Sequence, residues 1–308
     1  PWWYAAPISA LSVNDNCIDF YIEPGDIGNP ADISYFPETS YITFENNSVT
    51  VNDTLDFKKI KIDRDWVATN NNFSVTGEIM DTTKRDTLFR NIYDPSLFTG
   101  TIFKKLLDKH GTTVKQLSKK NQNLNLYNEI TVHYSDSLIV SAKNLMNESD
   151  NLTAELFVKS IGAMDTLPGT WDTGLDSVKS FLAQQVKIDT SQIRLADGSG
   201  VSRYTLTSSD QLISLLTWVY NSNYKDNFIS TLPGGGWEDS TLEKRLTEEG
   251  GLVRAKTGGL SGARNLAGYI YSQKYGTVAF SILMNGYIGS SSKHRYVQNQ
   301  IVKTIIYD

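Results

Sequence analysis

The spacing of apolar residues changes twice along this chain, and this change limits the folds open to it. In the first third, apolar and polar residues alternate with the period of half-buried strands, as in segments 17–22, 57–62 and 73–79. From about residue 137 the spacing is helical. It then returns to strands at 252–255, 265–272 and 277–284, before a closing helix at 291–307. Strands, then helices, then strands and a last helix predict the α+β class.

The same pattern gives more local expectations. Asn-rich turns at 14–16 and 46–47 predict two hairpins, the first joining strands 8–13 and 17–22 and the second joining strands 41–44 and 49–51. Asp94 and Pro95 predict the start of a helix that Gly111 ends, with Phe103 on its apolar face. The helical spacing of apolar residues predicts further helices, which we place at 138–145, 152–161, 172–186, 208–221 and 240–249.

Composition excludes several classes of protein. The formal net charge of the 308 residues is −5, with no basic excess to displace counterions from phosphates, so we expect no nucleic-acid partner. The sequence contains no apolar run long enough for a transmembrane segment. A single cysteine, Cys17, permits no internal disulfide, and we expect it to be packed as a small apolar residue. The three histidines lie far apart in the sequence and form no metal motif, so we expect neither a metal nor a cofactor.

Two tripeptides contain residue types that are suited to catalysis. Ser149-Asp150-Asn151 lies between two predicted helices, and Lys256-Thr257-Gly258 lies at the end of a predicted strand. Each is weak evidence by itself. In this order they match two of the three elements, S-x-x-K, S-D-N and K-T-G, of the serine enzymes that recognise penicillin.

Longer stretches strengthen the match. The segments 146–155, 168–171, 196–203, 253–258 and 265–269 follow one another in register with those of a known family. The chain resembles the D-alanyl-D-alanine carboxypeptidase/endopeptidase family, class C low-molecular-mass penicillin-binding proteins of the penicillin-binding protein 4 type. The resemblance implies a transpeptidase domain like those of penicillin-binding proteins and serine β-lactamases, an antiparallel sheet with helices. It further implies that residues 1–135 are a β-rich inserted region with one helix near 95–110, and that residues 136–308 are the C-terminal part of the catalytic domain.

The resemblance also implies roles for site residues. Ser149 would relay a proton to the leaving amine, and Asn151 would fix the substrate amide. Lys256 would place a cation beside the reacting groups. A helix-capping role for Ser149 and a solvated strand position for Lys256 remain the alternatives. Asp150 should point away from the site and serve solubility or capping.

The end of the same strand would bind substrate. Thr257 would donate its hydroxyl, Gly258 would let the substrate backbone approach closely, and the amide of Gly259 would be one oxyanion donor. The family usually has a hydroxyl residue where this chain has Gly259, so one side-chain contact is lost.

One element is missing from the expected place. The family's acylating serine and its lysine precede the inserted region, whereas the S-x-x-K letters found here, Ser290 to Lys293, follow the K-T-G motif. We therefore expect the nucleophile upstream of Pro1, and the chain alone to be inactive. The missing N-terminal part, cleaved but still bound, is an expected partner.

These expectations combine into one function. The chain would belong to a serine-type D-Ala-D-Ala carboxypeptidase/endopeptidase of the bacterial cell envelope, periplasmic or secreted, acting on peptidoglycan stem peptides and inhibited by β-lactam antibiotics. The alternative is a non-catalytic peptidoglycan-binding module or pseudoenzyme. A β-lactamase is disfavoured by the large inserted β region.

Overall fold

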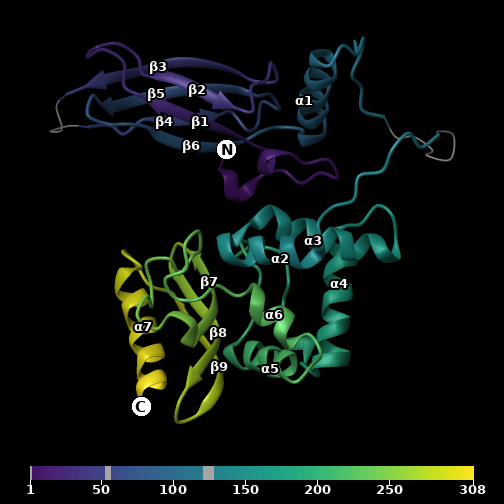
Figure 1. The fold of residues 1–308 in the computed structure, drawn as a ribbon, viewed down its shortest axis with the longest axis vertical. Helices are drawn as coiled ribbons and strands as arrows, with labels where there is room; N and C mark the ends of the chain where they lie inside the picture. Colours follow the sequence, from purple (N-terminus) through teal and green to yellow (C-terminus); the bar gives the residue numbers. More distant parts are fainter. Residues whose placement is uncertain (1, 53–56, 121–127) are drawn as a thin grey trace. The chain divides into compact units, whose positions relative to one another are not determined.

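The computed structural model describes residues 2–52, 57–120 and 128–308. The chain divides into two compact units, Pro1–Thr131 and Val132–Asp308, here called the N-terminal unit and the C-terminal unit. Figure 1 shows that strands dominate the first and that helices pack around a sheet in the second.

The N-terminal unit contains two three-stranded sheets. One has the order β2-β1-β6 and is antiparallel, with β1 (Cys17–Glu23), β2 (Asp32–Phe36) and β6 (Asp86–Asn91). The other has the order β3-β5-β4 and contains β3 (Thr43–Val51), β4 (Lys61–Arg64) and β5 (Asn72–Met80). Here β3 runs parallel to β5, whereas β4 is antiparallel to it.

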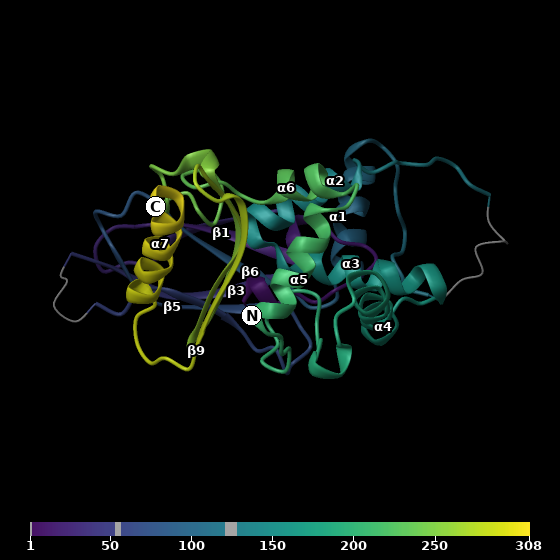
Figure 2. The same cartoon turned by 90° about the horizontal axis from the view of Figure 1, so that it is seen from below.

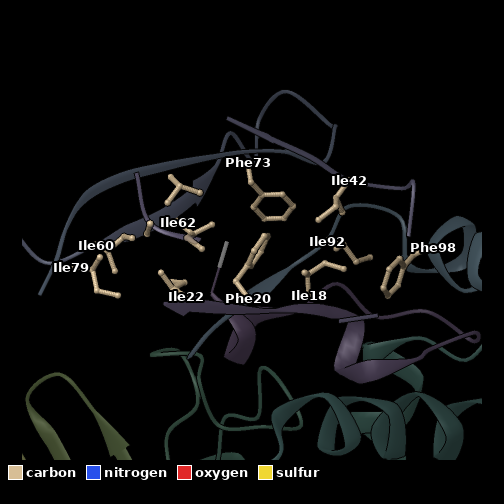
Figure 3. Close-up of a cluster of buried hydrophobic side chains, with 12 residues drawn as sticks. Ile18, Phe20, Ile22, Ile42, Ile60, Ile62, Phe73, Ile79, Ile92 and Phe98 are labelled. Carbon is tan, nitrogen blue, oxygen red and sulfur yellow. The ribbon is translucent and has the colours of Figure 1, made fainter. Parts of the chain in front are cut away.

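The two sheets enclose one apolar core. Alternate residues of β1, Ile18, Phe20 and Ile22, are fully buried and face the second sheet. The ring of Phe20 lies 5.1 Å from that of Phe73 on β5, and Figure 3 shows the two rings at the centre of the cluster. Cys17, at the start of β1, is buried as expected.

Helix α1 (Pro95–Lys109) begins where the sequence predicts. The Asp94 carboxylate accepts a hydrogen bond from the Leu97 N–H at 3.2 Å, which caps the helix. Its buried face differs from the expected one, because Phe98 is fully buried and Phe103 is 61% exposed.

Both predicted hairpins of this unit are wrong. Residues 8–13 form no strand, and the turn Asn14–Asn16 is a 3₁₀ turn that leads into β1. The second turn does not exist, since β3 runs unbroken through Asn46 and pairs with β5 along its whole length. The Asn46 side chain finds partners within the strand environment by donating to the carbonyl of Ala31 and accepting from the Ser48 hydroxyl. These bonds satisfy the Asn46 side-chain amide while its backbone stays in the strand.

The C-terminal unit has one antiparallel sheet of order β7-β8-β9, with strands β7 (Val253–Leu260), β8 (Ala263–Ser272) and β9 (Gly276–Asn285). Six helices accompany it: α2 (Leu138–Asn144), α3 (Asn151–Asp165), α4 (Trp171–Phe181), α5 (Ser209–Tyr220), α6 (Lys225–Thr231) and α7 (Ser292–Tyr307). Figures 1 and 2 show α7 on one face of the sheet and α5 on the other. These elements fit the predicted α+β class.

The predicted helix at 240–249 is absent. Residues 238–249 form turns and bends, although Leu242 and Leu246 are buried at helical spacing. Leu246 adopts φ +53°, a left-handed conformation that a helix cannot contain. The seven-residue helix α6 was not predicted.

Candidate active site

Lys256 lies on β7 and points to the face of the sheet away from α7. Val253 and Ala255 are buried in a cluster that includes Val302 of α7. Side chains alternate along a strand, so Lys256 projects from the opposite face.

Ser149 lies at the junction of α2 and α3. It ends a π-helical turn, Leu145–Ser149, and has φ +64°, in the left-handed region that non-glycine residues seldom occupy. The next residue, Asp150, caps α3 by accepting from the N–H groups of Leu152 and Thr153. Asp150 therefore performs the helix capping that the sequence left open for Ser149. Backbone strain and π-turns are frequent at functional sites.

The structure brings Ser149 and Lys256 together. Lys256 Nζ donates to Ser149 Oγ at 2.6 Å, across 107 residues of sequence, and to the carbonyl oxygen of Thr257 at 3.0 Å. Both acceptors are neutral oxygens. Burial lowers the pKa of Lys256 to about 8, because the ammonium form is poorly solvated there. A lysine with this pKa can give and take a proton near neutral pH, and Ser149 Oγ is placed to pass it on.

Asn151 belongs to the same junction. It is the first residue of α3, follows the Asp150 cap and is half-buried. Asn151 therefore starts α3 two residues after Ser149.

The end of β7 presents backbone groups on its outer edge, the edge away from β8. The Ala255 N–H donates outwards to the carbonyl of Pro233 at 3.0 Å. Backbone groups of an antiparallel strand point to alternate sides. The N–H groups of Thr257 and Gly259 therefore also point outwards, past the part of the edge that Pro233 covers.

The packing around Gly258 does not require a glycine. It lies opposite Asn265 on β8, and an added β-carbon would meet the Asn265 β-carbon at 3.4 Å, a close contact that a small shift relieves. The absence of a side chain leaves room at the strand for another molecule.

Glu155 is a residue that the motifs did not reveal. Its buried carboxylate accepts from Trp171 Nε1 at 2.7 Å, from the N–H groups of Gly198 and Ser199 at 2.9 Å each, and from the Ser199 hydroxyl. It thus fixes the 197–200 turn on the first turns of α3. The available signal was an acidic residue among the apolar positions of the predicted helix.

The same loop also reaches the sheet. Arg203 Nη2 donates to the carbonyl of Ser261, in the turn after β7, at 2.8 Å. The loop from Gly198 to Arg203 therefore connects the start of α3 to the end of β7, the two elements that carry Ser149 and Lys256.

No group of three or more His, Cys, Asp or Glu side chains in the described parts of the chain is placed to hold a metal ion. Among these same residues, no helix combines the length and hydrophobicity that crossing a bilayer requires.

The profile of one protein family, described as D-Ala-D-Ala carboxypeptidase 3 (S13), matches residues 1–305. The chain belongs to this carboxypeptidase family. A D-alanyl-D-alanine carboxypeptidase of Actinomadura sp. is 32% identical over 304 residues, which is 94% of this chain and 56% of the relative. A penicillin-sensitive carboxypeptidase A of Dictyostelium discoideum is 26% identical over 310 residues, 92% of this chain and 56% of the relative. This chain thus spans little more than half the length of these members of the carboxypeptidase family.

The fold is that of a penicillin-binding protein. The crystal structure of penicillin-binding protein 4 from Haemophilus influenzae, in complex with a β-lactam, superposes with a TM-score of 0.79 at 22% identity, covering 98% of this chain and 72% of that one. The α+β class and the resemblance to this carboxypeptidase family, both predicted from the sequence, are confirmed.

The S-x-x-K sequence of this chain, Ser290 to Lys293, lies at the start of α7. Ser290 precedes α7, and the Ser290 and Ser292 hydroxyls are bonded to each other at 2.9 Å. Because α7 covers the face of the sheet away from Lys256, these serines begin an element on the other side.

Proposed function

We propose that this chain carries the proton-transfer and substrate-binding groups of a serine-type D-Ala-D-Ala carboxypeptidase/endopeptidase. The observation that supports the proposal most is the 2.6 Å bond from Lys256 Nζ to Ser149 Oγ, made by two residues of separate motifs. Family membership and the left-handed backbone of Ser149 are consistent with it.

In the proposed reaction an acyl group passes from a peptide to a serine and then to water. Lys256 favours the proton-donating state of Ser149, which protonates the amine as it leaves. Asn151 holds the substrate amide. The outward N–H of Gly259 donates to the oxyanion, and Thr257 and Gly258 line the strand along which the peptide lies.

We propose that the acylating serine comes from a segment outside these 308 residues. Among the described residues β9 pairs with β8 along one side, and its other edge carries no strand. An exposed strand edge is a site for pairing with another segment. Such a segment would be the N-terminal part of the same protein, whether continuous with this chain or cleaved and still bound. Residues 1–135 would then be an inserted region and 136–308 the C-terminal part of the catalytic domain.

The proposed substrate is the stem peptide of peptidoglycan, which places the protein in the bacterial cell envelope, and β-lactams would act as inhibitors. Removal of a terminal D-Ala and cleavage of cross-links would use the same groups.

Labelling with a fluorescent penicillin tests the proposal. The isolated 308-residue chain should remain unlabelled, whereas the longest gene product that contains it should form a covalent adduct. Labelling of the isolated chain would contradict the external nucleophile, and Ser290→Ala would then be the first variant to map. If the long form binds peptidoglycan but is never labelled and never releases D-Ala, the protein is a non-catalytic wall-binding module.

A further inference from the structure

Arg264 occupies the space beside the residue that follows the K-T-G motif. It lies opposite Gly259 in the pairing of β7 with β8. A β-carbon added to Gly259 would lie 2.8 Å from Arg264 Cζ and would overlap Nη1. The guanidinium thus fills the place where a side chain at 259 would extend.

The Arg264 guanidinium has no acidic partner among the described residues. Its Nε is buried and makes no hydrogen bond, and no carboxylate lies within ion-pair distance. Burial and the nearby cations Arg295 and Arg264 lower the pKa of Arg245 to about 10, so Arg264 has a second arginine as a neighbour. Arg245 itself is bonded to the neutral side chains of Gln298 and Asn299. A buried donor in a group of uncompensated cations favours an anion.

Two cations lie on opposite faces of the sheet near the end of β7. Lys256 projects from one face of the sheet, and Arg264, which shares a face with Leu266 and α7, lies on the other. The outward N–H of Gly259 lies between these faces. A carboxylate lying along the edge can therefore be approached from both sides.

We propose that Arg264 is a specificity-determining residue that binds the free α-carboxylate of the residue released from the substrate. This inference rests on the proposed function, because it takes the edge of β7 as the peptide site. A guanidinium presents paired donors that match a carboxylate, and it replaces the hydroxyl that a residue at position 259 would offer. The selected substrates are peptides whose leaving residue carries a free α-carboxylate, in preference to their carboxamides.

The test compares an N-acylated peptide ending in D-Ala-D-Ala with its C-terminal carboxamide. In the long form of the protein, Arg264→Met should lower the ratio of kcat/KM for acid over amide by roughly 10- to 100-fold and leave the amide nearly unchanged. Arg264→Lys should retain part of the ratio. Adding Gly259→Ser to Arg264→Met should recover part of it, because the space is then free for a hydroxyl.

Arg295→Met is the matched control, because it removes an exposed cation of the same cluster without touching Gly259. It should change the ratio by less than about threefold, since exposed charges are screened. An equal fall for both peptides in Arg264→Met would show a merely structural role and overturn the inference.

If the unsubstituted long form hydrolyses neither peptide, the proposed function fails by itself. The inference is then judged by calorimetric titration of the 308-residue chain with both peptides. Tighter binding of the acid, lost in Arg264→Met, supports it, and equal or undetectable binding of the two overturns it.

Discussion

The two units differ in how completely their buried polar side chains are hydrogen-bonded. In the N-terminal unit, Arg64 donates from all three nitrogens, to the carbonyls of Asn91 and Asn70 and to the Asn91 side chain. In the C-terminal unit, Arg254 Nη1 and Arg264 Nε are buried without a hydrogen bond, although the Arg254 guanidinium lies over the Trp237 ring. The difference extends beyond arginine. Eight buried side-chain atoms in the described residues lack a partner, and one of them, Thr99 Oγ1, belongs to the N-terminal unit.

This contrast distinguishes a unit whose buried polar groups are nearly all satisfied from one in which several are not. Buried polar groups are normally satisfied because an unmade bond costs free energy. The N-terminal unit follows that rule. The C-terminal unit departs from it around the strand that carries Lys256, where burial also lowers the pKa of that lysine to about 8. Departures of this kind concentrate at functional sites.

The largest expected effect is on chemistry. Lys256→Met should lower the rate of acylation of the long form by β-lactams by about 10³-fold, because the proton donor beside Ser149 and its charge are both lost. Stopped-flow or time-resolved labelling with a fluorescent penicillin measures this rate. Lys303→Met, which removes an ion-paired lysine of α7, is the control and should acylate normally. Wild-type rates in Lys256→Met would remove Lys256 from the mechanism.

Arginine substitutions test the contrast directly. Arg64→Met should lower the free energy of unfolding of the 308-residue chain by about 2–4 kcal/mol, since it strands several buried acceptors. Arg264→Met should lower it by less than about 0.5 kcal/mol, because its buried Nε has no bond to lose. Urea unfolding followed by circular dichroism measures both. Equal losses would mean that the two units hold their arginines for the same reason.

The pH dependence of stability sharpens the account of Lys256. Its pKa in the folded protein, about 8, lies below the ordinary lysine value of 10.5, so the unfolded state binds more protons between these pH values. Wild-type stability should therefore rise with pH through this window relative to Lys256→Met. At pH 7 the Met variant should be the more stable, by on the order of 2 kcal/mol, and the gap should close towards pH 10.5. Thermal melts at matched pH values measure the gap. A gap that is constant with pH would contradict the lowered pKa.

The elements predicted correctly from the sequence are those in which the spacing of apolar residues agrees with the tertiary packing. The three strands of the C-terminal sheet and α7 combine a clear period with turns between them. The resemblance to the carboxypeptidase family implies roles for Ser149 and Lys256 in one site, and the structure brings the two side chains into contact. Arg264 could not be found in this way, since its significance depends on its pairing with Gly259 across two strands.

The failures have physical causes as well. Asn46 and Asn47 have the composition of a turn, yet parallel pairing with β5 absorbs them into a strand. Leu242 and Leu246 have helical spacing, yet the left-handed backbone at Leu246 forms turns. In both places tertiary contacts overrode the local preference.

The smallest expected effect concerns the backbone of Ser149. At φ +64° a β-carbon costs about 1 kcal/mol relative to glycine, part of which the greater freedom of unfolded glycine offsets. Ser149→Gly should therefore be more stable than Ser149→Ala by about 0.5–1 kcal/mol, although both lose the hydroxyl. Chemical unfolding of the two variants measures the difference, and Ser141→Gly against Ser141→Ala, within α2, is the matched control with the opposite sign. If alanine is favoured at both positions, Ser149 carries no strain, and its conformation is an ordinary helix end rather than one that the site maintains at a cost in stability.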